Sequence, residues 1–361
     1  MKIIDCDVHP RMNSMSQLHP YLSEEWRQRM GVQTSSKGSD SNTARNVFTI
    51  PKRWYFHPHG AERNDAIPPD GGRPGSDLKF FSEKHLDFFE IDYAIMISGD
   101  LFGIGGLPDA DMAAAFMSAN NDWLLHEWAE KDSRLKLAIN VGPRDPILAV
   151  QEIERLGGND SVVQVQIPEF DVLLGNRHFY PIYEAAERYG LPIGFHGAGE
   201  SAGVNTPMSP VGIPSYFIEV HTGMPMIGQA HVISLVAEGV FERFPKLKFV
   251  FQEVGYSWVP SVMWRFDQEW KSMRNEVPWL TKPPSEYILE NVRFTTQPIC
   301  EAPDNSQHLQ LLDMVHADKT LVFSSDYPHW DSDDPRRIFA GLSDQIKNRI
   351  YFESAAELYE F

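Results

Sequence analysis

Short runs of apolar and β-branched residues alternate along the chain with longer segments of helical period. The short runs cover residues 1–5, 92–98, 135–141, 162–167, 192–197, 247–253, 292–296 and 320–326, and each has the length of a strand that is buried on both faces. The segments of helical period cover residues 109–131, 145–156, 180–190, 226–244 and 334–342. This alternation predicts an α/β fold of the (β/α)8 type, the TIM barrel.

A doubly wound open sheet has the same alternation of strands and helices. That fold is often marked by G-x-G-x-x-G directly after an early strand. The glycines of LFGIGGLPD (101–109) have a different spacing. We therefore expect one barrel domain over residues 1–361.

Two polar stretches interrupt the pattern, at about 32–79 and at 197–217, and both are rich in Gly, Pro and Ser. In a barrel, loops that follow strands form the face that carries the active site. We expect both insertions to cover that face as a lid or a pocket wall, although plain surface disorder fits PPDGGRPG (68–75) equally well,. His57 and His59 lie in the first insertion, where no strand aims them, and we do not assign them to a site.

The charge of the chain excludes several classes of partner. Fifty acidic and 32 basic residues give a formal net charge of -18, which disfavours nucleic acid and anionic membrane surfaces. No membrane span and no leader is evident, so we expect a cytoplasmic protein. Cys6 and Cys300 are too few for a disulfide framework,.

Acidic and histidine side chains stand where several of the predicted strands end. Asp7 and His9 are two residues apart, so both project to the same side of an extended strand,. His196, Glu253 and Asp326 end the fifth, sixth and eighth strands. A lone histidine at a strand end is as often a structural residue, but several such groups at one end of a barrel form a site suited to Zn, Mn or Fe.

The sequence resembles the amidohydrolase superfamily, in the amidohydrolase-related branch that includes aminocarboxymuconate-semialdehyde decarboxylase and aromatic-acid decarboxylases. The motifs that carry the resemblance are IIDCDVHP (3–10), NDWLLHEW (121–128), YPIYEAAERYGLPIGFHG (180–197), EGVFERFPKLKFVFQEVGYSWVPSVMWRFDQEW (238–270), LVFSSDYPHWDSDDP (321–335) and ESAAELY (353–359). The resemblance implies a divalent metal held by Asp7, His9, His196 and Asp326.

The sequence departs from the family pattern at two strands. Glu253 stands where many members have a histidine, and VVQVQIPEF (162–170) lacks the lysine that bridges two metals in dinuclear members. A lysine-bridged pair of ions is therefore not expected. Glu253 and His221 are nevertheless possible ligands of a second metal in another arrangement.

The resemblance implies a metal-dependent decarboxylase or hydrolase that acts on a small carboxylated compound, either aromatic or not. Asp326 or Glu253 is expected to act as the general base, or Asp326 as the acid that protonates the substrate. His329 follows Asp326 closely and is a further catalytic candidate. Trp330 and His221 are expected to line the substrate pocket.

Two alternatives remain open from the sequence. One is a dinuclear non-haem iron or iron/manganese oxygenase of the same fold, since some relatives of this branch activate oxygen with two metals. The other is a metal-bound structural subunit of a hetero-oligomer with a homologous active chain. The resemblance also implies a homo-oligomer, for which the Trp-, Met- and Phe-containing segment 257–270 supplies an apolar contact,.

Overall fold

Eight parallel strands form one sheet in which each strand pairs with the next along the chain. The computed structural model describes residues 1–29, 62–100, 107–168, 171–197, 214–339 and 341–361. The strands are β1 (Ile4–Val8), β2 (Tyr93–Met96), β3 (Leu135–Asn140), β4 (Val162–Pro168), β5 (Ile193–His196), β6 (Phe249–Gln252), β7 (Val292–Thr295) and β8 (Leu321–Val322). Hydrogen bonds from the Cys6 N–H to the Phe323 carbonyl (2.9 Å) and from the Asp326 N–H to the Asp7 carbonyl (3.0 Å) join the first and last strand segments. The predicted TIM barrel is confirmed.

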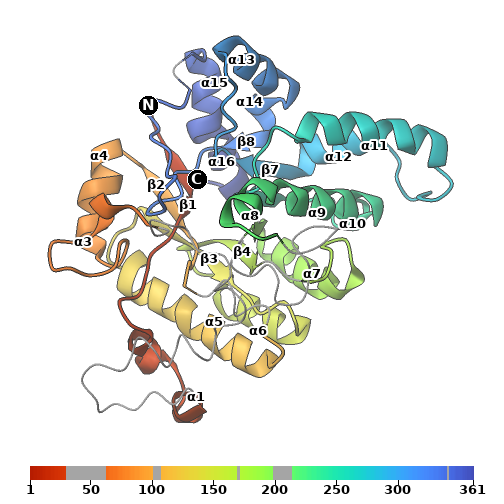
Figure 1. Cartoon of the computed structure of the whole chain (residues 1–361). Coiled ribbons are helices and arrows are strands. Elements are labelled where there is room, and N and C mark those ends of the chain that lie inside the picture. The colour runs from red at the N-terminus through yellow and green to blue at the C-terminus, as the bar shows by residue number, and fades with distance from the viewer. Residues whose placement is uncertain (30–61, 101–106, 169–170, 198–213, 340) are drawn as a thin grey trace.

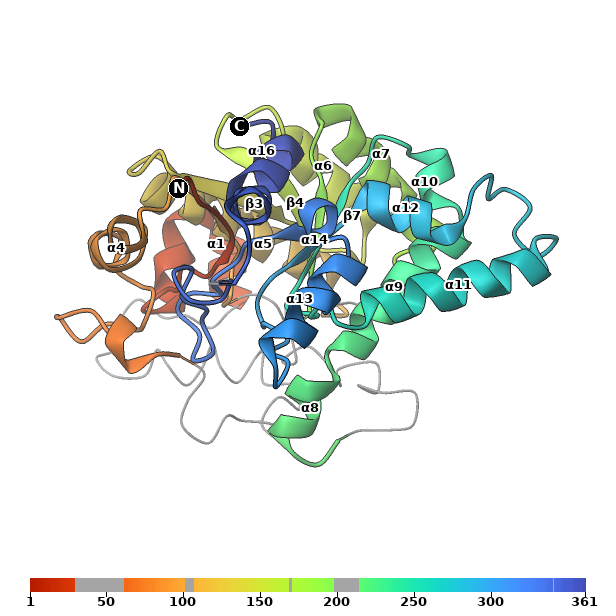
Figure 2. The same ribbon diagram turned by 90° about the horizontal axis from the view of Figure 1, so that it is seen from above.

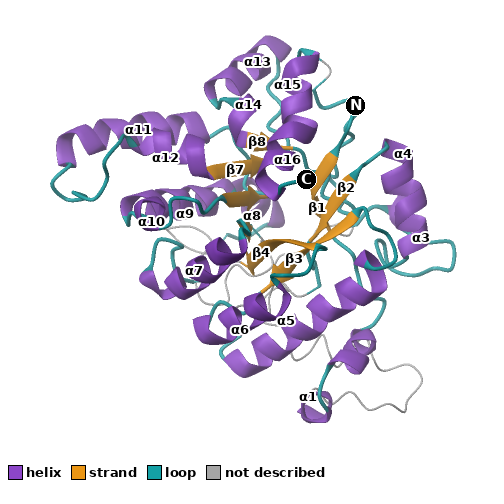
Figure 3. Ribbon diagram, turned by 180° about the vertical axis from the view of Figure 1, so that it is seen from behind, coloured by secondary structure: helices purple, strands orange, loops and turns teal. Residues whose placement is uncertain are grey.

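Helices lie around the outside of the strands (Figure 1; Figure 3). The α-helices of the described ranges are α1 (Glu24–Arg29), α3 (Leu78–Phe81), α4 (Asp87–Phe89), α5 (Ala110–Leu124), α6 (Pro146–Leu156), α7 (Tyr180–Tyr189), α8 (Phe217–Gly223), α9 (Pro225–Ala237), α10 (Val240–Arg243), α11 (Val259–Met273), α12 (Pro284–Asn291), α13 (Asn305–Met314), α14 (Ala317–Thr320), α15 (Asp344–Asn348) and α16 (Ser354–Tyr359). Within these ranges, no helix combines the length and the apolar character that crossing a bilayer requires.

Two clusters of buried apolar residues stabilise the barrel. The larger cluster includes Leu137 on β3 and Phe116 on α5, and it fills the layer between the sheet and the helices. The smaller cluster brings Cys6 of β1 together with Val250 of β6 and Tyr359 of α16. Because β1 and β6 are not neighbours in the sheet, their contact places this cluster inside the ring of strands. The interior is therefore packed, and chemistry is confined to the end of the barrel.

One predicted helix is wrong. Residues 335–339 form consecutive turns, and residue 340 lies outside the described ranges. The Asp334 carboxylate accepts the Arg336 N–H (2.9 Å), and the Tyr351 hydroxyl donates to the Pro335 carbonyl (2.6 Å). The Tyr351 bond occupies the Pro335 carbonyl, which a helix would pair within itself, so the helical period of 334–342 is overridden,.

The helix predicted over 226–244 is divided into α9 and α10. Gly239, between them, has a φ of 72°. A left-handed residue ends a helix, and glycine takes this conformation without a steric penalty. The predicted segment is therefore helical on both sides of one break.

Part of the first insertion lies against the end of the barrel. The Arg63 N–H donates to the Pro328 carbonyl (2.9 Å), and the Arg11 N–H donates to the Gly75 carbonyl (2.8 Å). These bonds attach residues 63–75 to the segments that follow β1 and β8. Residues 30–61 and 198–213, which hold most of both predicted insertions together with His57 and His59, lie outside the described residues.

Candidate metal centre

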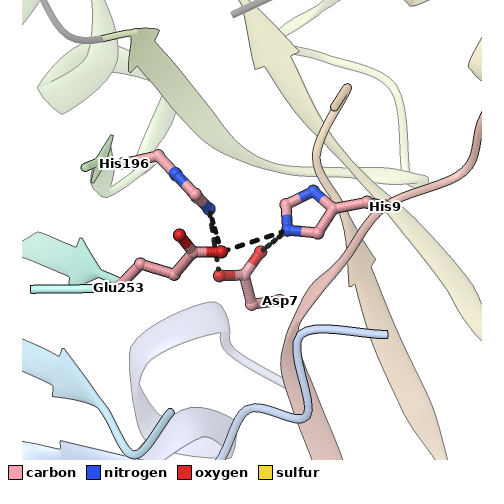
Figure 4. A group of neighbouring side chains, drawn as sticks. All are labelled: Asp7, His9, His196 and Glu253. Atoms are coloured by element: carbon pink, nitrogen blue, oxygen red, sulfur yellow. Dashed lines mark ion pairs between the residues drawn. The ribbon is translucent and has the colours of Figure 1, made fainter. Parts of the chain in front are cut away.

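Four side chains from three strands point toward one another at one end of the barrel (Figure 4). Asp7 lies on β1 and His9 directly after it, His196 ends β5, and Glu253 follows β6. The His9 Nε2 lies 3.2 Å from Asp7 Oδ1 and 3.8 Å from Glu253 Oε1. The His196 Nε2 lies 3.4 Å from Asp7 Oδ2 and 3.3 Å from Glu253 Oε1.

A second group of side chains shares His9 and Glu253 with the first. Its other members, Asp326 and His329, follow β8. The Asp326 Oδ1 lies 3.0 Å from His9 Nε2 and 2.5 Å from His329 Nδ1. In each group the potential ligand atoms all lie within 4.8 Å of one another. The structure thus brings together Asp7, His9, His196, Glu253, Asp326 and His329, which sequence analysis singled out separately.

The spacing and chemistry of these atoms fit a divalent cation. Ligand atoms that bind one ion at about 2.1 Å lie roughly 3.0 to 3.5 Å from their neighbours. The contacts between Asp7, His9, His196 and Asp326 span 3.0 to 3.4 Å. Both carboxylate oxygens of Asp7 are buried, and neither has a hydrogen-bond partner in the described part of the chain. Imidazole and carboxylate ligands suit Zn, Mn or Fe.

A register shift in β1 aims Asp7 into this site. The pairing of β1 with β2 shifts between Asp5 and Val8. Asp5 contacts His85 Nε2 at 2.8 Å in the helical segment Ser82–Leu86, whereas Asp7 contacts His196 across the barrel. Strict alternation along a strand would place Asp5 and Asp7 on the same side. The irregularity in β1 therefore separates a structural carboxylate from a site carboxylate.

Two of the site carboxylates stand on left-handed backbone. Glu253 has a φ of 53° and Asp326 a φ of 61°. Residues other than glycine rarely adopt this region, and such strain is concentrated at functional sites. Glu253 comes directly after β6 and Asp326 lies four residues after the end of β8, and at both positions the left-handed backbone directs the side chain over the barrel end.

The tautomer of His9 is set by the neighbouring strand. The His9 Nδ1 lies 3.1 Å from the Ile97 carbonyl oxygen. A carbonyl only accepts hydrogen bonds, so Nδ1 carries the proton. The Nε2 lone pair of His9 then faces Asp7 and Asp326. This is the usual arrangement of a metal-binding histidine, in which the other ring nitrogen donates to a carbonyl or carboxylate.

The pocket holds an excess of negative charge. Burial raises the pKa of Asp7 to about 6, and burial together with the charge of Glu253 raises the pKa of Asp326 well above its usual range. Burial lowers the pKa of His196, but the Glu253 and Asp7 carboxylates outweigh it and raise this pKa to about 10. Burial raises the pKa of Glu253, but His196 and His329 outweigh that effect and hold it low. Bound protons thus offset the carboxylates, and a divalent cation would offset the same charge.

His221 and Trp330 lie beside the centre and outside both ligand groups. The His221 Nε2 lies 3.3 Å from Asp331 Oδ2, and its ring centroid lies 5.7 Å from that of Trp330. The hydrogen bond to Asp331 raises the pKa of His221 above its usual value. The His221 side chain is 28% exposed, so it belongs to the wall of the site. The structure does not bring His221 to the metal ligands.

Sequence analysis missed two residues that contact His329 and His221. Arg11 lies two residues after His9, and its Nη2 lies 2.7 Å from His329 Nε2. Asp331 holds His221 and also accepts a hydrogen bond from the Gln297 amide (2.9 Å). In the sequence, the available signal was that Arg11 is close to His9 and Asp331 is next to Trp330. Such closeness does not indicate where the side chains of Arg11 and Asp331 point.

A model of the amidohydrolase family, described as Amidohydrolase, matches residues 4–361. The chain belongs to this family. The family assignment confirms the resemblance given by the strand-end motifs. The chain is also 23% identical to the gamma-resorcylate decarboxylase of Rhodococcus jostii (strain RHA1) over 313 residues, which cover 78% of this chain and 86% of the relative.

Solved structures agree with the barrel fold. A 5-carboxyvanillate decarboxylase from Novosphingobium aromaticivorans, crystallised with manganese and a nitrobenzoic acid, superposes with a TM-score of 0.69 at 20% identity, covering 99% of this chain and 96% of the other. An amidohydrolase from Mycobacterium avium subsp. paratuberculosis superposes with a TM-score of 0.68 at 22% identity, covering 99% and 98%. At these identities the likeness establishes the fold.

Proposed function

We propose that this amidohydrolase-family protein is a metal-dependent decarboxylase of a small aromatic carboxylic acid. The observation that carries the proposal is the convergence of Asp7, His9, His196 and Asp326 at the end of the barrel, with separations that suit one divalent ion. The similarity to decarboxylases of aromatic acids supports the choice of reaction.

Asp7, His9, His196 and Asp326 would hold the metal, and Glu253, which belongs to both ligand groups, is placed to join them. When bound, a divalent cation such as Mn, Zn or Fe supplies positive charge that orients an anionic substrate and stabilises charge developing on its oxygen. The buried carboxylates set the affinity for that cation. His9 contributes a lone pair whose direction the Ile97 carbonyl fixes.

Decarboxylation of an aromatic acid needs one proton at the ring carbon that bears the carboxylate. We assign delivery of this proton to Asp326, because burial keeps its carboxyl group protonated more readily than an exposed aspartate,. The new C–H bond forms at that carbon, and the C–C bond then breaks. Its electron pair restores the aromatic ring as carbon dioxide leaves.

A hydrolase uses the same residues differently. Glu253 or Asp326 would then remove a proton from the attacking water, and the products would be an acid and an alcohol or amine. Decarboxylation is the better choice because two of the three similar proteins named above are decarboxylases of aromatic acids. Turnover of esters or amides without release of carbon dioxide would favour the hydrolase.

The dinuclear oxygenase rests on the second ligand group, which shares His9 and Glu253 with the first. This alternative requires two redox-active ions per chain and consumption of oxygen. The structural-subunit alternative predicts no turnover and no oxygen uptake by this chain alone. It also requires a homologous active chain that copurifies.

The experiment that tests the proposal is an assay of purified, metal-replete protein with 2,6-dihydroxybenzoate, 5-carboxyvanillate and related hydroxybenzoates. We expect stoichiometric carbon dioxide and phenol, about one metal ion per chain, and no oxygen uptake. An Asp326→Asn variant is the control and should release no carbon dioxide. Two ions per chain with oxygen consumption would instead identify the oxygenase.

Replacement of His221 by Gln is expected to weaken substrate binding. We propose that the raised pKa of His221 keeps a positive charge beside Trp330, where it attracts the substrate carboxylate. Loss of one charged hydrogen bond raises KM by about tenfold with little change in kcat. Asp331→Asn should shift KM in the same direction by less, and an unchanged KM in both variants would contradict the assignment.

We also propose that the chain forms a homo-oligomer through α11. This helix extends away from the barrel (Figure 2), and Trp264 on it is 60% exposed. Large apolar side chains are enriched in subunit interfaces. Sedimentation at micromolar concentration should give a dimer or larger assembly, and Trp264→Ser should shift it toward the monomer. A wild-type monomer would contradict this proposal.

A further inference from the structure

Arg11 reaches His329 from the side opposite the metal centre. The Arg11 Nη2 lies 2.7 Å from His329 Nε2, and the Arg11 side chain is only 7% exposed. A guanidinium group carries N–H donors and no acceptor. The Nε2 of His329 must therefore present its lone pair to Arg11.

A neutral imidazole carries one N–H, so in His329 that proton is on Nδ1. This nitrogen lies 2.5 Å from Asp326 Oδ1, to which its N–H can donate, and 3.6 Å from Glu253 Oε1. His9 has the opposite arrangement, because its Nδ1–H donates a hydrogen bond to the Ile97 carbonyl and its Nε2 lone pair faces the pocket. The two rings lie side by side, with centroids 4.6 Å apart. Toward the centre, His9 therefore presents a lone pair and His329 presents an N–H donor.

We propose that Arg11 is a positioning residue that holds His329 as its Nδ1–H tautomer. In this form His329 donates a hydrogen bond to Asp326 and supplies no ligand to a cation. The bond fixes the rotation of the Asp326 carboxyl group, the group that would deliver the proton to the substrate. Of the two overlapping ligand groups, the one that contains His329 therefore holds no separate ion.

The surroundings of Arg11 fix its guanidinium in this position. Its Nη1 lies 3.5 Å from Asp100 Oδ1, and its Nη2 lies 4.0 Å from Glu62 Oε1. Gly99 packs flat against the guanidinium, since a Cβ there would lie 2.8 Å from Arg11 Cζ. Any side chain at residue 99 would thus push the Arg11 guanidinium away from its present place.

Nuclear magnetic resonance of zinc-loaded protein labelled with ¹⁵N-histidine tests the tautomer directly. The signals of His329 are identified by their loss in His329→Gln. In the wild type we expect a proton on Nδ1 and an unprotonated Nε2. In Arg11→Met, which removes the donor, the proton should redistribute toward Nε2, and Gly99→Ala should give a partial shift in the same direction.

Arg73→Met is the matched control. Arg73 also pairs with Asp100 (2.9 Å) and lies 3.7 Å from Glu62, but it has no contact with His329 in the described residues. Loss of Arg73 should weaken the same ionic network and leave the His329 tautomer unchanged. The comparison separates the hydrogen bond to His329 from general stabilisation by the network.

Kinetics provide a second measurement, which rests on the proposed decarboxylation. Arg11→Met should lower kcat by roughly tenfold to a hundredfold with KM nearly unchanged, because a misoriented acid impairs proton transfer and not binding. Arg11→Lys, which restores a donor, should recover part of kcat. Metal content should stay near the wild-type value in all these variants.

The proposal is overturned if wild-type His329 carries its proton on Nε2, or if Arg11→Met leaves both the tautomer and kcat unaltered. Loss of metal in Arg11→Met together with two ions per wild-type chain would also overturn it, since His329 would then be a ligand. The tautomer measurement needs no substrate. Absence of decarboxylation would therefore contradict the proposed function and leave the role of Arg11 supported or refuted on its own result.

Discussion

Asp7→Asn is expected to empty the metal centre while the barrel still folds. The Asp7 carboxylate contacts both His9 and His196, and neither of its oxygens has a hydrogen-bond partner among the described residues, so we expect its charge to bind the cation. Loss of the cation removes several kcal/mol of charge stabilisation in the transition state, which corresponds to a rate about a thousandfold lower. Metal analysis and the rate of carbon dioxide release measure the two effects.

Asp5→Asn provides the matched control for this experiment. Asp5 is also a buried carboxylate on β1, but it contacts His85 and accepts the Ser325 N–H (2.8 Å). Its loss should lower the free energy of unfolding and leave the metal bound. Full metal occupancy in Asp7→Asn would contradict the assignment of the centre. Equal metal loss in both variants would show that Asp7 acts through the fold alone.

The fold was predictable because strands buried on both faces leave continuous apolar runs in the sequence. The runs ending near His196 and Glu253 coincide with β5 and β6 to within a few residues. The helix predicted over 334–342 does not form, and the cause is a tertiary contact. Its apolar spacing is helical, but the carbonyl of Pro335 is bound by Tyr351, a residue distant in sequence. Hydrophobic spacing carries no information about such a tertiary hydrogen bond.

The centre was predictable to the extent that it depends on strand ends. Parallel strands finish at one edge of a sheet, so acidic and histidine residues at those points meet whatever the loops do. The site's finer geometry depends on contacts that spacing does not encode. Arg11 and His329 are 318 positions apart, and the register shift in β1 that separates Asp5 from Asp7 leaves no mark in the sequence. His221 lies on α8, and the spacing of residues in the sequence does not predict where this helix lies relative to the centre.

Glu253→Gln is expected to distinguish two roles for the residue that departs from the family pattern. If Glu253 binds the metal, the variant loses metal, because an amide oxygen carries no charge to hold a cation. If Glu253 is a general base beside the metal, the metal stays and turnover falls by roughly a hundredfold or more. Unchanged metal and unchanged turnover would contradict both roles. The 3.3 Å contact with His196 favours the first role.

Glu253→Gly addresses the same residue through the backbone. Glu253 has a φ of 53°, and a side chain in this conformation costs about 1 to 2 kcal/mol that glycine does not incur. The metal-free variant should therefore unfold at a higher denaturant concentration than metal-free wild type while its turnover is lost. The matched control is Glu90→Gly at the end of α4, where φ is 55° and the residue lies outside both ligand groups; it should gain stability and keep full activity. If both variants gain stability and only Glu253→Gly loses activity, the strained turn after β6 is retained for the position of its carboxylate.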